Sequence, residues 1–121
     1  MIKSHKYNAK KTVIDWIKFS SAFEARIYNY FIDNGIEILS TQIKFELQPK
    51  FRYKWELIRP IWFIPDFLIK YKGKEILVEA KGMETPEFKI KRKLFLCKYP
   101  ELNYIVAKSV KSLVEQLKAF D

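Results

Sequence analysis

The chain has few of the residue types on which several classes of protein depend. Its 121 residues include one cysteine, Cys97, and one histidine, His5. A single cysteine can form neither an intrachain disulfide nor a cysteine-based zinc site. A single histidine near the N-terminus argues against a histidine-based nuclease and a Ser-His-Asp hydrolase. We expect Cys97 to be a small buried residue on a helix.

Long hydrophobic runs and internal divisions are also missing. No apolar stretch approaches the roughly 20 residues that a membrane-spanning helix needs, and the charged N-terminus lacks the apolar segment of a signal peptide. No linker, repeat or low-complexity run interrupts the chain, and its length suits one domain. The sequence therefore predicts a single cytoplasmic domain over residues 1–121, with a mobile basic N-terminus over residues 1–10.

Basic residues outnumber acidic ones, by 23 to 14, which gives a net charge of +9 and a pI of about 9.6. Such a field attracts polyanions and favours contacts with DNA phosphates through counterion release. Charge alone identifies no function, because many small basic proteins bind nucleic acid weakly or not at all. An acidic pair inside a basic protein is more informative.

Such a pair occurs in a predicted hairpin. Residues 61–71 and 74–81 read as strands, with Lys72-Gly73 as a tight turn. If those two residues form the loop, Asp66 lies directly opposite Glu79. Directly opposed residues share a sheet face with Cβ atoms roughly 5 Å apart, and like charges there destabilise the sheet.

The rest of the hairpin contrasts with this pair. One step from the turn, Lys70 opposes Glu75, which is a favourable pairing. Alternation along the strand returns Lys81 to the face of Glu79. The opposite face of the second strand reads as core: Ile76, Val78 and Ala80.

Two carboxylates at this spacing suit a hard divalent cation. Mg²⁺ takes oxygen ligands and keeps several waters that a phosphate can replace, and Mn²⁺ is the natural substitute. The alternative is a solvated face on which Asp66, Glu79 and Lys81 make ordinary surface pairs.

The residues around the pair resemble a known superfamily. Ile64-Pro65-Asp66-Phe67, followed by Val78-Glu79-Ala80-Lys81-Gly82, is similar to the PD-(D/E)XK nuclease signature. Members of that superfamily include restriction endonucleases and Holliday junction resolvases. Residues 19–25, 45–49 and 85–91 are similar to segments of a small, largely phage-encoded branch, and the resemblance covers most of residues 7–107. Where that branch usually has Asp-Gly in a turn, this chain has Asp15-Trp16, and Trp16 is a candidate exposed aromatic contact.

Caps and periodicity predict an order of helix, three strands, helix, strand and helix. This matches the α/β fold that the resemblance implies, an αβββαβ restriction-endonuclease-like core with a mixed sheet flanked by helices. The expected elements are a hairpin over 11–19, a helix over 21–34, a strand over 36–47 with or without a break near Thr41, a basic and aromatic loop or hairpin over 48–59, the two hairpin strands, a helix from the Thr85 cap to Tyr99, a strand over 102–107 and a helix from Ser109 to Phe120.

The resemblance implies a Mg²⁺-dependent DNA endonuclease that hydrolyses a phosphodiester. Asp66 and Glu79 would bind the metal, with the Ala80 carbonyl as a further ligand. Lys81 would orient or deprotonate the attacking water. Glu24 has two readings: with Ser21 it forms a capping box, but in similar resolvases an acid on the first helix completes the metal site, and we expect Glu24 to be catalytic.

Basic residues of two regions are expected to hold phosphates. Within the second helix, Lys91 falls in the apolar arc, where it either snorkels to water or points over the sheet at the metal site. Leu96 projects from the basic face and is a candidate for a dimer surface. The predicted DNA contacts are Lys50, Arg52, Lys54, Lys89, Lys91, Arg92 and Lys93.

Branched DNA is the expected substrate, because small stand-alone members of this superfamily are often junction resolvases, and symmetric cutting of two strands implies a homodimer. If the chain is phage-encoded, it would act in the host cytoplasm. One alternative is an endonuclease for duplex or nicked DNA within a packaging, recombination or transposition machine, which would cut linear and four-way DNA equally. The other is a non-catalytic DNA-binding module on a nuclease fold, which would bind without cleaving.

Overall fold

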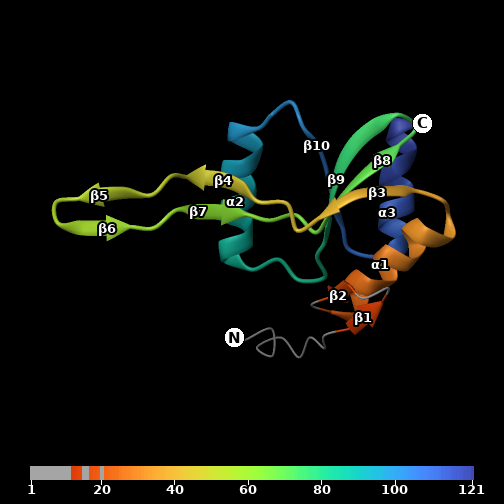
Figure 1. Ribbon diagram of the computed structural model, residues 1–121. Coiled ribbons are helices and arrows are strands. Elements are labelled where there is room, and N and C mark those ends of the chain that lie inside the picture. Colours follow the sequence, from red (N-terminus) through yellow and green to blue (C-terminus); the bar gives the residue numbers. More distant parts are fainter. Residues whose placement is uncertain (1–11, 15–16, 20) are drawn as a thin grey trace.

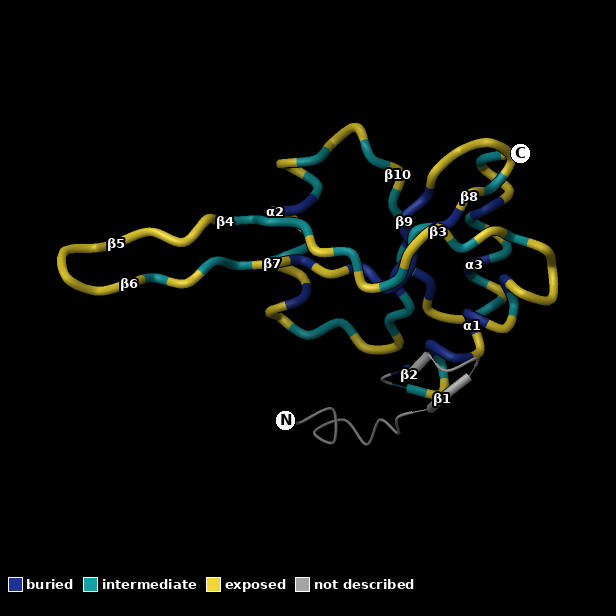
Figure 2. The backbone as a smooth tube through the Cα atoms, in the orientation of Figure 1, coloured by how far each residue is buried: buried dark blue, intermediate teal, exposed yellow. Residues whose placement is uncertain are grey.

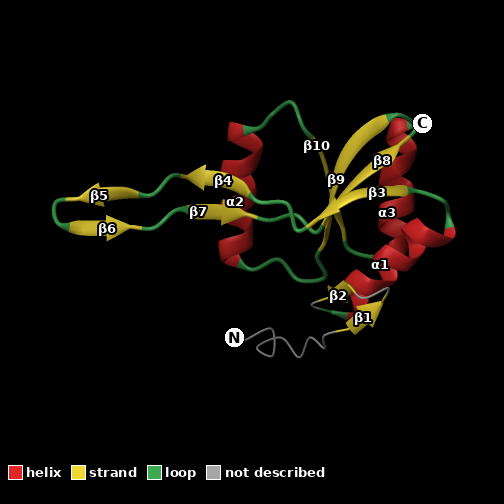
Figure 3. Cartoon of the chain, viewed as in Figure 1, coloured by secondary structure: helices red, strands yellow, loops and turns green. Residues whose placement is uncertain are grey.

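The computed structural model describes residues 12–14, 17–19 and 21–121 (Figure 1). A four-stranded mixed sheet lies between helices in this part of the chain (Figure 3). The predicted α/β class, with a mixed sheet flanked by helices, is therefore confirmed. The predictions for the N-terminal residues 1–10 and for the Asp15-Trp16 turn concern residues outside the described ranges.

The central sheet has the strand order β10-β9-β8-β3. Strand β8 pairs antiparallel with both β3 and β9, whereas β10 runs parallel to β9. Helix α2 supplies the crossover connection that a parallel pair requires. The strands are β3 (Glu37–Thr41), β8 (Phe67–Tyr71), β9 (Lys74–Ala80) and β10 (Asn103–Ala107).

Each helix begins at a hydroxyl side chain that accepts a backbone hydrogen bond, as the sequence predicts. The cap residues are Ser21, Thr85 and Ser109. No helix of the described residues has the length and apolar character needed to cross a membrane. The helices are α1 (Ala22–Asp33), α2 (Pro86–Lys98) and α3 (Val110–Leu117), which is followed by a 3-10 turn (Lys118–Phe120).

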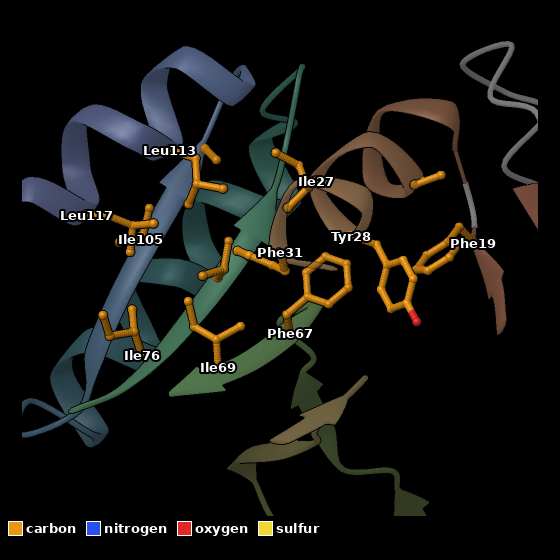
Figure 4. Close-up of a cluster of buried hydrophobic side chains, with 13 residues drawn as sticks. Phe19, Ile27, Tyr28, Phe31, Phe67, Ile69, Ile76, Ile105, Leu113 and Leu117 are labelled. Carbon is orange, nitrogen blue, oxygen red and sulfur yellow. The ribbon is translucent and has the colours of Figure 1, made fainter. Parts of the chain in front are cut away.

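One face of the sheet packs against α1 and α3 through an apolar core (Figure 4). Ile76 and Val78 of β9 are fully buried in it, and Ala80 packs at its edge. The predicted core face of β9 is therefore confirmed. The labelled side chains of this core are Phe19, Ile27, Tyr28, Phe31, Phe67, Ile69, Ile76, Ile105, Leu113 and Leu117.

A second core fills the other face of the sheet, beneath α2 and a small two-stranded sheet of β4 (Phe45–Gln48) and β7 (Ile61–Phe63). The ring of Phe95 lies at its centre, with ring centroids at 4.8 Å from Phe63, 5.1 Å from Phe45 and 5.3 Å from Tyr104. The face that carries Asp66 and Glu79 is therefore largely covered, and the solvated-face alternative is wrong.

Two predictions for α2 are corrected by this packing. Leu96 is half-buried and packs against the second core, so it does not project from the basic face of the helix as expected. Cys97, expected to be buried, is exposed. The apolar face of the helix is narrow, and Ile90 and Leu94 also remain exposed to solvent.

The predicted strand over residues 61–71 is two strands in different sheets. Strand β7 ends at Phe63 and pairs with β4, while β8 begins at Phe67 and belongs to the central sheet. Pro65 lies between them and has no N–H to donate to a ladder. Residues 36–47 likewise divide into β3 and β4, and Gln42, with a φ of 57°, lies in the break.

Beyond β4 and β7 the chain continues as a β-hairpin arm that projects from the body (Figures 1 and 2). The arm contains β5 (Phe51–Tyr53) and β6 (Glu56–Ile58), which pair antiparallel with each other. Residues 48–59, expected as a loop or an extended hairpin, thus form the hairpin. The predicted N-terminal hairpin is also present, with β1 (Thr12–Ile14) paired to β2 (Ile17–Phe19).

Candidate metal and phosphate site

The β8–β9 hairpin has the register that the sequence predicts. Lys72 and Gly73 form its turn with φ angles of 52° and 80°, the left-handed values that a two-residue type I′ turn requires. Lys70 pairs with Glu75, and at the other end Phe67 pairs with Val78. The next pair in this register is Asp66 and Glu79.

Three carboxylates from separate elements are buried at this end of the hairpin. Glu24 on the first turn of α1 is 4% exposed, Asp66 before β8 is 8% exposed, and Glu79 near the end of β9 is 6% exposed. Within the described ranges, neither Asp66 nor Glu79 forms an ion pair with a cationic side chain. Buried acids are rare in proteins unless they are paired or bind a metal.

Hydrogen bonds fix the Asp66 carboxylate. Its Oδ2 atom accepts from the Ala80 N–H at 2.8 Å, and its Oδ1 atom accepts a long bond from Gln42 Nε2 at 3.5 Å. A hydrogen bond also links Asp66 with Glu24. The Ser21 hydroxyl accepts from the Glu24 N–H at 3.1 Å. Glu24 therefore takes part in capping α1 through its backbone, while its side chain reaches the acid pair.

Burial is the main cause of the raised pKa values of Asp66 and Glu79. It raises the pKa of Asp66 to about 6, with a further increase from the charge of Glu79 and an opposing hydrogen bond from Glu24. Burial likewise raises the pKa of Glu79 to about 7, although the positive charge of Lys81 lowers it. The two side chains are hydrogen-bonded to each other, so without a counter-charge Glu79 keeps its proton for much of the time up to neutral pH, and Asp66 loses its proton at a lower pH.

Two neighbours of the pair were missed by sequence reasoning. Gln42 has a positive φ, and its N–H donates to the Asp66 carbonyl at 3.1 Å. A glutamine in a sequence gives no sign of a positive φ, so this contact could not be predicted. The Tyr104 hydroxyl is buried without a hydrogen bond of ordinary geometry in the described residues, yet it is close enough to Glu79 to lower that carboxyl's pKa. Burial, and then the charge of Glu79, raise the pKa of Tyr104. Only the strand alternation of β10 could have placed Tyr104 on this face.

An open pocket of about 350 Å³ adjoins Glu79. Lys81 and Lys91 both line it, and the Lys81 Nζ lies 4.7 Å from the centroid of the Phe88 ring. Lys91 also pairs with Glu87, with 3.0 Å between Nζ and Oε2. The structure therefore brings Lys81 to Glu79 and places Lys91 in the lining of the same pocket, where it pairs with the exposed Glu87. The pocket is lined by Trp62, Phe63, Ile64, Glu79, Lys81, Thr85, Glu87, Phe88 and Lys91.

The other predicted phosphate contacts divide into two groups. Lys89 and Lys93 are exposed on α2, and Arg92 is half-buried there. The second group is exposed on the projecting arm and lies away from the pocket: Lys50, Arg52 and Lys54.

Asp66 and Glu79 are the two side chains of this cluster that could hold a metal ion. No three His, Cys, Asp or Glu side chains in the described ranges form a ready set of metal ligands. Mg²⁺ is usually bound by one or two carboxylates, with waters in its remaining positions. The two buried acids fit such an ion, whereas Glu24 contacts the pair through Asp66.

A family model described as "Protein of unknown function (DUF1064)" matches residues 4–114. The chain belongs to this family. The match includes the acid pair, the pocket and the arm. Searches of curated proteins and of solved structures gave no match.

Proposed function

We propose that this protein is a divalent-metal-dependent DNA endonuclease acting in the cytoplasm. The observation that carries the proposal is the burial of two facing acids, Asp66 and Glu79, beside a pocket with two lysines in a protein of charge +9. A fold that required only stability would gain from placing an apolar or cationic residue at one of these positions.

The chemistry of the two acids fits a hard cation. Asp66 and Glu79 would hold Mg²⁺ or Mn²⁺, and Glu24 and the Ala80 carbonyl would complete its surroundings. When bound, such an ion acts as a Lewis acid for a phosphoryl oxygen and lowers the pKa of water. Binding would also neutralise two acids that are costly to ionise where they are buried.

Lys81 is suited to stabilise charge that develops on phosphate. Its side chain lies along the Phe88 ring and lines the same pocket as Glu79. A compact ammonium group in this place can hold a water for in-line attack, assist removal of its proton, and donate to a non-bridging oxygen. Lys91 lines the other part of the pocket and can contact an adjacent phosphate.

DNA would bind across α2 and along the arm. Lys89 and Lys93 are exposed on α2, the helix that also contributes Phe88 and Lys91 to the pocket. Positive groups in two separated regions suit a long polyanion better than a small phosphorylated metabolite. Branched DNA is our first choice of substrate, because the chain resembles junction resolvases. A homodimer would then be needed to cut two strands symmetrically.

A cleavage assay tests the proposal directly. The purified chain is mixed with a labelled four-way DNA junction, or with its linear arms, in Mg²⁺, in Mn²⁺ or in EDTA. Glu79→Gln, purified identically, controls for contaminating nucleases. We expect metal-dependent cleavage of the junction by the wild type alone. Equal cutting of linear DNA would favour the duplex nuclease, and binding without cleavage would favour the non-catalytic module.

A further inference from the structure

The β-hairpin arm, residues 49–60, has no covering from the rest of the described chain. Every residue from Phe51 to Leu57 is exposed (Figure 2). An isolated two-stranded hairpin is marginally stable in water, because it has no core to pack against. An arm of this kind is typical of a segment that acts by contacting a partner.

The two faces of the arm differ in chemistry. Phe51 pairs with Ile58, which gives one face an apolar pair, whereas Arg52 pairs with Leu57 on the other face. Residues 48–62 include four basic residues and one acidic residue. This excess of positive charge, carried among exposed aromatic rings, is complementary to a nucleic acid. A hydrophobic protein partner would be poorly matched by the same charges.

The tip of the arm presents a tryptophan to solvent. Trp55 is 86% exposed, the highest value among the large hydrophobic residues of the described chain. Its backbone is held in place, since Lys54 takes a φ of 56° and Arg52 Nη1 donates to the Trp55 carbonyl at 3.4 Å. The ring therefore lies on a tight turn in contact with solvent and adds little to the packing of the described residues.

The base of the arm is fixed to the body next to the pocket. Lys98 Nζ, at the end of α2, and the hydroxyl of the C-cap residue Tyr99 donate to the Glu46 carbonyl of β4 at 2.9 and 3.0 Å. Trp62, which follows the arm on β7, lines the pocket beside Glu79. DNA held by the arm would therefore pass over the acid pair.

We infer that the arm enters a groove of DNA and that Trp55 stacks on a base exposed at a branch point. The major groove, about 12 Å wide and 8.5 Å deep, admits a two-stranded β-ribbon. At about 3.3 Å per residue, the stretch from Pro49 to Lys54 spans roughly 20 Å, which is enough to cross it. Unpaired or unstacked bases at a branch offer a free π-face to a tryptophan, whereas an intact duplex does not. Trp55 is then the residue that discriminates branched from linear DNA.

This inference rests on the proposed function, since both concern the same DNA, but its test does not require cleavage. Binding is measured by fluorescence anisotropy in the Glu79→Gln background, with a four-way junction and with a linear duplex of one of its arms. Trp55→Ala should weaken junction binding about tenfold and duplex binding less than twofold, as loss of one base-stacking contact predicts. Trp55→Phe should retain most of the affinity. Ile32→Ala removes an apolar side chain of 51% exposure outside the arm and should change neither.

A second measurement reports the stacking itself. In a chain with Trp16→Phe and Trp62→Phe, emission comes from Trp55 and should be strongly quenched by the junction and weakly by the duplex. Equal quenching by both DNAs, or equal binding by Trp55→Ala and the parent, would overturn the inference while leaving cleavage untouched. If Trp55→Ala converts a dimer into a monomer and lowers the affinity for both DNAs equally, the arm would instead be assigned to a contact between copies of the chain. Absence of metal-dependent cleavage in the wild type is the separate failure of the proposed function.

Discussion

The two ends of the β8–β9 hairpin differ although they belong to the same pair of strands. One pair away from the turn, Lys70 faces Glu75, and both side chains are exposed. At the open end, Asp66 and Glu79 continue the same register, and both are buried. The turn end has the charge pairing that stabilises a hairpin, and the open end has the pairing that destabilises one.

The difference indicates that the open end of the hairpin, and not the turn end, lowers the stability of the fold. A pair of opposite charges exposed to water contributes little to the free energy of folding. The Lys70–Glu75 pair is therefore an ordinary surface feature. Two buried acids without a cationic partner in the described residues raise the free energy of the folded state whenever both ionise. Such an arrangement is typical of sites where a ligand supplies the missing charge.

The largest expected effect comes from removing the unfavourable pair. Asp66→Asn and Glu79→Gln should each lower cleavage by at least about a thousandfold, because each removes a charged oxygen ligand. Both should retain DNA binding, since the lysines on α2 and the arm remain. Rates on a labelled junction test this, with Glu75→Gln at the turn end as the matched control. Normal cleavage by either site variant would remove the pair from the active site.

Glu24 gives the next effect in size. Glu24→Gln should lower cleavage by about ten- to a hundredfold, with partial rescue by raised metal, because glutamine is a poor ligand for Mg²⁺. Stability should change little, because the cap bond comes from the N–H of residue 24, which the substitution leaves in place, and glutamine has nearly the same shape as glutamate. A thermal melt and a cleavage rate on the same preparation separate the roles. Full activity would remove Glu24 from the active site and leave only its backbone contact with the Ser21 cap.

The pH dependence of stability should follow the raised pKa values. With folded values of about 6 for Asp66 and 7 for Glu79, the folded state binds more protons than the unfolded state above pH 4. The free energy of unfolding should therefore fall as pH rises from about 4 to 8, by roughly 6 kcal/mol in the absence of metal.

Urea unfolding at several pH values measures this dependence. Glu79→Gln should flatten it, and Glu75→Gln should not. Millimolar Mg²⁺ should restore stability above pH 7, because binding to the native state alone adds RT ln(1 + [L]/Kd). A metal-free stability that rises over the same range would contradict the assignment of burial as the dominant cause.

The smallest expected effect concerns the basic residues of α2. Lys89, Arg92 or Lys93 to Ala should each make the slope of log K against log salt shallower by roughly one unit, because each removes one phosphate contact. Lys118→Ala, an exposed change in the 3-10 turn that follows α3, should leave the slope unchanged. Anisotropy titrations between about 50 and 200 mM salt measure the slopes. Equal changes for all four variants would indicate a diffuse field rather than an oriented interface.

Local signals in the sequence determined the register and the helix starts. The Lys72-Gly73 turn fixes which residues face each other, because two residues with positive φ close a hairpin in only one register. From that register came the Asp66–Glu79 pair and the position of Lys81. Thr85 and Pro86 fixed the start of α2 by the same kind of local chemistry, a cap hydroxyl followed by a preset φ.

Tertiary structure alone decided what surrounds the pair. The break at Pro65 sends β7 to a second sheet, and no local pattern says which strand β7 will meet. The depth of the acids, the approach of Gln42 and Tyr104, and the reach of Glu24 all follow from contacts between residues distant in the chain. Burial is a property of the assembled layers, so the raised pKa values of Asp66 and Glu79 could not be predicted from the sequence.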